Sequence, residues 1–307
     1  HLLTMKLAGI DGVIVDWYGL QQFRDYAILN RNTQRLVDQT SRLGMKVVIC
    51  YEDQTIPALV KAGRLKPDKR VAHATSEIEW LTKRWFRLEN YVRLEGRPVL
   101  LSFGQTGLTN DEWKQCLAGL KSPVAYFSEH LRRSAAMGAF DWPIPTQGLM
   151  AIKRFRETSR QWPYSIPVAF PRFVDIYAQA KVSASYGRVA DNRGETFKTS
   201  MAEALQAKTP LVQIATWNDW GEGTMIEPSQ EFGYRDLEVV QKLRRRFLDA
   251  RFPATTSDLR LPARLLQHRR TKTSEAQVRD CDRIAALIAA GRLAGARAEL
   301  GKLLLRR

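Results

Sequence analysis

The chain has 307 residues, of which 44% are hydrophobic and 26% are charged, and its 48 Lys and Arg against 32 Asp and Glu give a net charge of +16. This composition excludes an intrinsically disordered chain and fits one main domain with an appendage. No apolar run approaches the roughly 20 residues of a membrane-spanning helix, and the first residues lack a signal-peptide pattern. We therefore expect a cytoplasmic protein, or a periplasmic or secreted one if an upstream leader exists.

The positive charge is concentrated near the C-terminus. Residues 241–307 hold 17 Lys and Arg but only 6 Asp and Glu, a net of +11. A basic segment can attract nucleic acid, anionic polysaccharide or anionic lipid, but charge alone argues for solubility and non-specific attraction. We expect a solvated basic face and no specific nucleic-acid partner.

In chain order, an apolar helix is expected over 2–11, and short β-branched or aromatic runs then alternate with amphipathic stretches. This alternation is typical of βα units and a parallel sheet. The predicted strands lie at 12–18, 46–52, 98–104, 123–129, 138–143, 165–170 and 210–218.

Seven strands are one short of a closed (β/α)8 TIM-like barrel, so we expect the first strand to lie upstream of His1. The barrel domain is expected to cover residues 1–240. An open, doubly wound sheet is the alternative fold.

The helices between these strands carry recognisable start and stop signals. Ser76–Glu79 and Thr109–Glu112 have the spacing of capping boxes, and Gly44 and Gly96 fall where a helix is expected to end. The helical patterns cover 32–44, 76–96, 109–120 and 195–208.

Residues 241–307 are expected to form a basic helical extension. Helical patterns cover 258–270 and 274–305, and Gly291 divides the second into a hairpin that resembles one tetratricopeptide-type unit. A single unit cannot bury its own apolar face, so it packs on the barrel or continues past Arg307. Removing the residues after about Asp258 is expected to leave the chemistry intact, with lower solubility or stability as a possible cost.

Three cysteines, Cys50, Cys116 and Cys281, lie far apart inside apolar segments, which is typical of buried free thiols. The sequence has no zinc-site spacing, P-loop or dinucleotide fingerprint. We expect no metal and no cofactor.

Several predicted strands end in polar or aromatic residues. In a parallel barrel the carboxyl ends of the strands meet on one face, where the loops build the active site. On this basis the predicted substrate-binding residues at the ends of the earlier strands are Trp17, Tyr18, Glu52, Asp53 and Trp142. Arg172 and Arg193 are further candidates, for a carboxylate or sulfate on the sugar.

The segment 215–228 carries two Trp, one Asn, three carboxylates and two Gly directly after the last predicted strand. Cleaving or making a glycosidic bond needs two carboxyl groups, and aromatic faces hold the sugar. The predicted catalytic pair is Asp219 and Glu222, which converge if the loop makes one tight turn at Gly221 and Gly223. An acidic solvated turn is the alternative, but such turns seldom carry Trp on both sides. The predicted sugar contacts from this segment are Trp217, Asn218, Trp220 and Glu227.

The run WNDWGEGTMIEP, followed by EFGYRDLE, resembles the signature of the glycoside hydrolase family 71/99-like group. This group includes family 99 endo-acting α-mannanases and the related WbsX-type glycosyltransferases. The opening MKLAGIDGVIVDWYG is similar too, so the resemblance covers about residues 1–238.

The resemblance implies that Glu222 is the acid/base. Asp219 takes the position of the carboxylate that draws the proton from the sugar 2-hydroxyl and assists through a 1,2-anhydro intermediate. The family has Glu where this chain has Asp219. A carboxylate displaced by about 1 Å can lose about 10²-fold in rate, which argues against activity on the family's usual substrate. The mannanases tend to carry a larger residue where this chain has Gly221, so the substrate identity is not carried over.

Three functions follow as expectations. The first is a retaining, metal-independent glycoside hydrolase that acts as a monomer on a polysaccharide or glycan. The second is a WbsX-like transferase of surface polysaccharide with a sugar-nucleotide donor, and the third is a catalytically weak sugar-binding barrel. For the first, Asp219 and Glu222 are expected to open into one cleft with Trp17, Glu52 and Trp142, and the pKa of Glu222 is expected to be raised.

Overall fold

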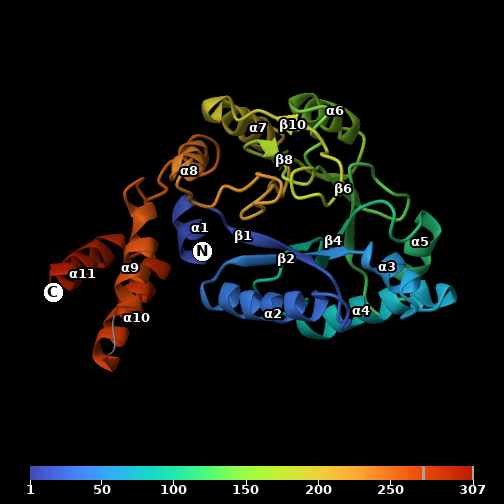
Figure 1. Ribbon diagram of the computed structural model, residues 1–307, viewed down its shortest axis with the longest axis horizontal. Helices are drawn as coiled ribbons and strands as arrows, with labels where there is room; N and C mark the ends of the chain where they lie inside the picture. The colour runs from blue at the N-terminus through green and yellow to red at the C-terminus, as the bar shows by residue number, and fades with distance from the viewer. Residues whose placement is uncertain (272–273, 306–307) are drawn as a thin grey trace. The chain divides into compact units, whose positions relative to one another are not determined.

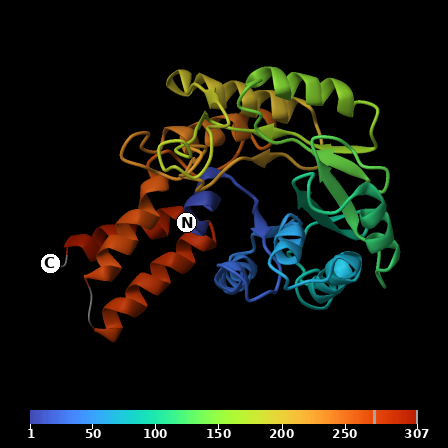
Figure 2. The ribbon, with the colours of Figure 1, turned by 45° about the vertical axis from the view of Figure 1, so that its right-hand side comes forward.

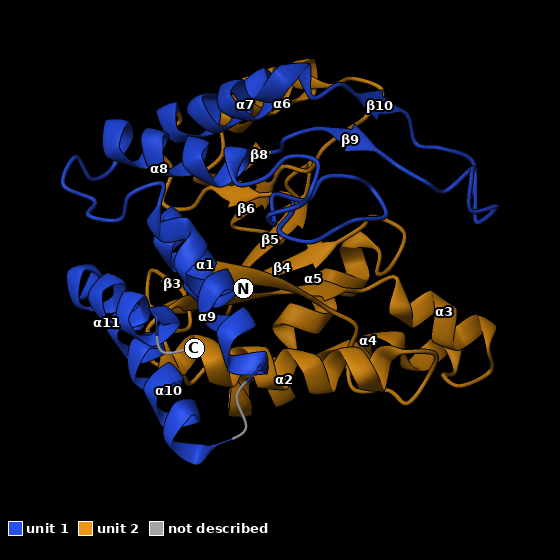
Figure 3. Cartoon of the chain, turned by 60° about the vertical axis from the view of Figure 1, so that its left-hand side comes forward, with its two compact units in different colours: residues 1–11, 170–206, 216–307 blue, residues 12–169, 207–215 orange. Residues whose placement is uncertain are grey.

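The computed structural model describes residues 1–271 and 274–305. The chain divides into two compact units, each built from segments that are far apart in sequence (Figure 3). The sheet unit comprises 12–169 and 207–215. The motif unit, which holds the WNDWGEGT run, comprises 1–11, 170–206 and 216–307.

The six main strands of the sheet unit are parallel and neighbour one another in chain order, and the short β3 (Arg93–Leu94) pairs antiparallel at one side of this path. A doubly wound sheet reverses its strand order at a switch point, whereas this order follows the chain. All seven predicted runs contain a strand, and the fold is an α/β half-barrel; closure and the upstream strand stay predictions. The strands are β1 (Gly12–Trp17), β2 (Lys46–Glu52), β4 (Arg97–Phe103), β5 (Ala125–Glu129), β6 (Gly138–Phe140) and β7 (Tyr164–Ile166), with the parallel pair β8 (Val168–Ala169) and β11 (Gln213–Ile214) beside them.

Both faces of this sheet are buried. In β2, Val47, Ile49 and Tyr51 join one apolar cluster, and Val48 and Cys50 join another on the opposite face. This two-sided burial is why the parallel strands read as nearly continuous apolar runs. Helices that lie along one side of the sheet cover the first cluster (Figure 1). The unit's helices are α2 (Tyr26–Arg42), α3 (Thr55–Lys61), α4 (Arg70–Arg84), α5 (Asn110–Ala118) and α6 (Leu149–Ser159).

Two of the predicted helix signals are confirmed. Thr109 Oγ1 accepts a hydrogen bond from the Glu112 N–H at 3.2 Å, and Glu112 Oε2 accepts one from the Thr109 N–H at 2.8 Å, which forms a capping box at the start of α5. Gly44 follows α2 with φ +63°.

The other two signals are wrong. Ser76 lies inside α4, which begins at Arg70 after the 3-10 turn η1 (Pro67–Lys69). Gly96, with φ +75°, turns the chain from β3 (Arg93–Leu94) into the antiparallel β4 instead of ending a helix.

The motif unit begins with α1 (Leu2–Ala8), the predicted apolar helix. An antiparallel pair of short strands follows later in the chain, and a loop over 175–187 joins these strands. The predicted helix at 195–208 is confirmed as α7. The elements are β9 (Phe173–Val174), β10 (Arg188–Val189), η2 (Asn192–Gly194), α7 (Glu195–Gln206) and α8 (Arg235–Phe247).

The C-terminal helices form a small bundle (Figure 2). It consists of η3 (Asp258–Arg260), α9 (Leu261–Arg270), α10 (Glu275–Ala289) and α11 (Leu293–Leu305). Gly291, with φ +70°, separates α10 from α11, so the predicted hairpin is confirmed. Helix α1 contacts α8, η3, α9 and α10, and the expected boundary at residue 240 falls inside α8. Among the described residues no helix has both the length and the apolar character needed to span a membrane.

Candidate active site

The segment after Ala215 forms a tight loop. The Thr216 N–H donates to the Thr224 carbonyl oxygen, and the Ile226 N–H donates to the Thr216 carbonyl oxygen, each at 3.0 Å. Gly223 has φ +66°, and a Cβ at this position would lie 2.8 Å from the Val174 carbonyl oxygen. Only glycine fits here, which agrees with the predicted tight turn.

The loop is also bonded to the extended segment that contains β9. The Val174 N–H donates to the Glu222 carbonyl oxygen at 2.8 Å, and the Ile176 N–H donates to the Gly221 carbonyl oxygen at 3.0 Å. The main chain of Glu222 is therefore held by a second strand-like segment in addition to its own turn.

Glu222 has two close polar neighbours, one at its carboxyl group and one at its main-chain N–H. Tyr177 Oη donates to Glu222 Oε1 at 3.3 Å, and Asp219 Oδ1 accepts from the Glu222 N–H at 2.9 Å. Partial burial, followed by the negative charge of Asp219, raises the pKa of Glu222 to about 7, although the hydrogen bond from Tyr177 opposes the rise. The expected direction of this pKa is confirmed.

Asp219 is held from both sides of the turn. Its N–H donates to Thr216 Oγ1 at 2.9 Å, while its carboxylate accepts from the Glu222 N–H. The two predicted carboxylates thus belong to a single turn, and Asp219 helps to shape that turn as well as placing negative charge beside Glu222.

Sequence reasoning missed Tyr177. It lies in the 175–187 loop and packs edge to face with Tyr186, with ring centroids 5.4 Å apart. Asp175 organises this loop, because its Oδ2 accepts from Ser185 Oγ at 2.9 Å and from the Tyr186 N–H at 2.8 Å. Two tyrosines in a segment without helix or strand signals were the available clue.

The other predicted contacts from the motif differ in exposure. Trp220 is 50% exposed and Asn218 is exposed, so both are open to a ligand. Trp217 and Glu227 are half-buried. Trp217 Nε1 donates to His1 Nδ1 at 3.1 Å. His1 Nδ1 also lies 2.9 Å from Glu227 Oε1.

Two predicted contacts in the sheet unit are corrected by the structure. Trp17 is fully buried against Trp80 and Trp85, and its Nε1 donates to Asn30 Oδ1 at 2.9 Å. It has no face left for a sugar. Side chains alternate along a strand, and Trp17 points to the helix-covered side of β1.

Asp53 is the second correction. It is fully buried, and its Oδ2 accepts from the Leu108 N–H at 3.0 Å and from Trp113 Nε1 at 2.8 Å. Because Asp53 continues the alternation of Ile49 and Tyr51, it supports the loop before α5 and does not face a ligand.

The remaining predicted residues of this unit lie at strand ends. Burial, followed by the charge of Asp16, raises the pKa of Glu52 to about 8. Tyr18 and Trp142 are half-buried, and Trp142 packs edge to face with Phe103 at a centroid distance of 5.0 Å. The expected gathering of polar side chains at the carboxyl ends of the strands is present.

A buried cluster that the sequence did not single out lies at the ends of β5 and β6. His130 Nδ1 is 3.4 Å from Asp141 Oδ1, and His130 Nε2 is 3.8 Å from Glu129 Oε1. Burial raises the pKa of both carboxyl groups. Over the described ranges, 1–271 and 274–305, no three His, Cys, Asp or Glu side chains are grouped closely enough to hold a metal ion.

A family model described as Glycosyltransferase WbsX matches residues 156–240, which include the loop with Asp219 and Glu222. This part of the chain is similar to WbsX-type glycosyltransferases. The resemblance to the WbsX and family 99 group is therefore confirmed. No curated protein matches the sequence.

Solved structures with a similar fold include family 99 endo-α-mannosidase from Bacteroides thetaiotaomicron. One structure, in complex with BIS-TRIS-propane, is 16% identical, with 81% of this chain and 83% of that chain covered and a TM-score of 0.56. A second is 15% identical, with 85% and 78% covered and a TM-score of 0.60. A glycoside hydrolase-like protein is 14% identical, with 80% and 84% covered and a TM-score of 0.58. At these identities the likeness shows the fold, which is TIM-barrel-like.

Proposed function

We propose that the chain is a retaining, metal-independent glycoside hydrolase that acts on a polysaccharide or other glycan. The observation that carries the proposal is the pKa of Glu222, raised to about 7 beside the negative Asp219. A carboxyl group that is half-protonated near neutral pH can give a proton to a leaving oxygen and later take one from water. The likeness to endo-α-mannosidases supports a glycan as substrate.

In the proposed reaction, Asp219 accepts the proton of the sugar 2-hydroxyl, and the freed oxygen attacks the anomeric carbon. Glu222 protonates the leaving oxygen at the same time. Water then opens the 1,2-anhydro ring at the anomeric carbon, giving its proton to Glu222, while Asp219 returns a proton to the 2-oxygen. Two displacements at the anomeric carbon leave its configuration unchanged. The proposed sugar contacts are Tyr18, Glu52, Trp142, Trp217, Asn218, Trp220 and Glu227.

The test is a screen of the purified chain against α-mannans and bacterial surface polysaccharides, with reducing-end release and glycan binding as separate readouts. Glu222→Gln is expected to lower release by about 10²- to 10⁴-fold while affinity is retained, because the amide keeps the shape but has no proton to give. Glu231→Gln, which changes an exposed carboxylate of the same region, is the matched control. Wild-type release by Glu222→Gln would refute the acid/base role.

A second candidate is a transferase, favoured by the WbsX match over 156–240. It requires a sugar-nucleotide donor, so turnover of nucleotide sugars by the wild type without reducing-end release would identify it. Glycan binding with neither activity would indicate a sugar-binding barrel.

A further inference from the structure

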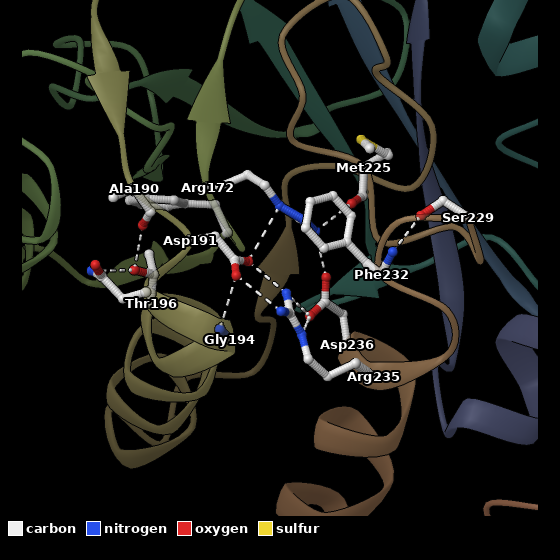
Figure 4. Close-up of polar contacts among 12 residues, drawn as sticks. Arg172, Ala190, Asp191, Gly194, Thr196, Met225, Ser229, Phe232, Arg235 and Asp236 are labelled. Carbon is white, nitrogen blue, oxygen red and sulfur yellow. Dashed lines mark hydrogen bonds and ion pairs between the residues drawn. The ribbon is translucent and has the colours of Figure 1, made fainter.

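Arg172, which directly precedes β9, is almost completely buried at 3% exposure. Its Nη2 donates to Asp236 Oδ2 at 2.5 Å and to the Met225 carbonyl oxygen at 3.1 Å, and its Nε lies 3.5 Å from Asp191 Oδ1 (Figure 4). Sequence reasoning made Arg172 a candidate for binding an acidic sugar, but a guanidinium enclosed by these partners does not face solvent.

Arg235 completes an ionic cluster, which we define as Arg172, Asp191, Arg235 and Asp236. Arg235 Nη2 donates to Asp191 Oδ1 at 2.5 Å, and its Nε donates to Asp236 Oδ1 at 3.0 Å. Both guanidinium groups lie over the Phe232 ring, with their Cζ atoms 3.6 Å and 5.1 Å from its centroid. The cluster has two positive and two negative groups, so its formal charges balance.

This cluster is fastened to the loop that carries Glu222. The extended segment that begins at Arg172 bonds the main chain of Glu222 through Val174 and its carboxyl group through Tyr177. Arg172 itself bonds the Met225 carbonyl oxygen, three residues after Glu222. Movement of Arg172 therefore displaces both the residues that bond Glu222 and the loop that bears it.

A buried ion pair is a poor source of stability, because the loss of hydration offsets most of the attraction. Arg172 Nη2 does, however, donate to two fixed partners, the Asp236 carboxylate and the Met225 carbonyl oxygen, and this rigid, planar group joins the two elements in one geometry, although its Nε and Nη1 are buried without a hydrogen-bond partner among the described residues. We propose that Arg172 is a positioning residue, which through the ionic cluster sets the place of the Glu222 carboxyl group relative to Tyr177 and Asp219. The inference rests on the proposed function of Glu222 in proton transfer.

The test compares Arg172→Lys with Arg297→Lys. Both keep the positive charge and remove a guanidinium, but Arg297 lies in α11 and pairs with Asp258 at 2.6 and 2.7 Å, away from the bonds that hold the Glu222 loop. The first readout is the pKa of Glu222, from ¹³C NMR of labelled glutamate carboxyls, with the signal assigned by its loss in Glu222→Gln.

Arg172→Lys is expected to lower the pKa of Glu222 by about one unit, because water admitted to a loosened loop reduces the burial that is the largest cause of the raised pKa, and this outweighs the loss of the smaller, opposing bond from Tyr177. It is also expected to lower kcat about 10-fold or more with little change in KM. Arg297→Lys is expected to change only thermal stability. An unchanged pKa in folded Arg172→Lys, or an equal shift in Arg297→Lys, would overturn the inference. If the wild type releases no sugar but the pKa still moves, the proposed function fails and the positioning role stands.

Discussion

Tyr177 and Asp219 act on the same carboxyl group in opposite directions. The hydroxyl of Tyr177 donates to Glu222 and so favours its ionised form, whereas the negative charge of Asp219 favours its protonated form. The acidity of Glu222 is therefore set by two side chains that can be changed separately.

Tyr177→Phe is expected to raise the pKa of Glu222 above its value of about 7, and Asp219→Asn is expected to lower it. Because a general acid works while protonated, the alkaline limb of kcat/KM in Tyr177→Phe is expected to move to higher pH. NMR titration of labelled glutamate checks both shifts without turnover. Shifts of the same sign would contradict this assignment of the two neighbours.

Two tryptophans are expected to have different roles, Trp220 in glycan binding and Trp17 in the stability of the core. Trp220→Ala is expected to weaken glycan binding by about 10-fold with little change in melting temperature, because half of its side chain is open. Trp17→Ala is expected to cost about 3–5 kcal/mol of folding free energy, because it empties a packed site. Calorimetric titration and denaturant unfolding measure the two effects. A Trp17→Ala variant of unchanged stability but weakened glycan binding would show that Trp17 is a sugar contact and not a core residue.

At the scale of elements, the apolar runs predicted the strands well because strands buried on both faces need continuous apolar sequence. The alternation of side chains along a strand predicts which face of the sheet each residue lies on. Grouping all strand-end residues in one site ignores this alternation, and it therefore wrongly includes Trp17 and Asp53. In the extended segment that follows Phe170, the sequence indicates only Arg172, as a direct sugar contact, and it does not predict Tyr177 or the bonds of this segment to the Glu222 loop. Its partners come from distant parts of the chain, and no local pattern records such contacts.

The two predicted capping boxes have the same sequence spacing, but only the one at Thr109 caps a helix. Thr109→Ala is expected to destabilise the protein by about 1 kcal/mol, because it removes the acceptor at the start of α5. Ser76→Ala, at an exposed position inside α4, is expected to be neutral or slightly stabilising, since Ala is the better helix former. Urea unfolding of the two variants measures the difference. Equal destabilisation would show that Ser76 does cap a helix.

At the scale of the whole molecule, the basic C-terminal helices are not a detachable tail. They belong to the same compact unit as Asp219 and Glu222, and they contact α1. Asp258, which is fully buried, takes its ionic partner Arg297 from α11. The boundary at residue 240, which the change to helical patterns after Glu238 suggested, stays a prediction.

Ending the chain at Arg260 is therefore expected to lower the free energy of unfolding by roughly 3 kcal/mol or more, because Asp258 loses its partner and α1 loses apolar cover. Thermal and urea unfolding check this expectation. Arg279→Gln, which removes an exposed pair with Glu275, serves as the control and is expected to be near neutral. A truncated chain with unchanged stability would restore the view of a separable extension.

The division of the motif unit into distant segments also has a consequence for biosynthesis. On the ribosome, α1 emerges well before α8, α9 and α10, the helices that it contacts in the folded protein. At about 5–20 residues per second, it waits roughly 10–50 s for them. During that interval the nascent chain presents Leu2, Met5 and Leu7 to solvent, whereas the strands from β1 to β7 can already pair. Helix α1 is thus made before these partner helices but packed only once they have emerged, and chaperones have this interval in which to bind it.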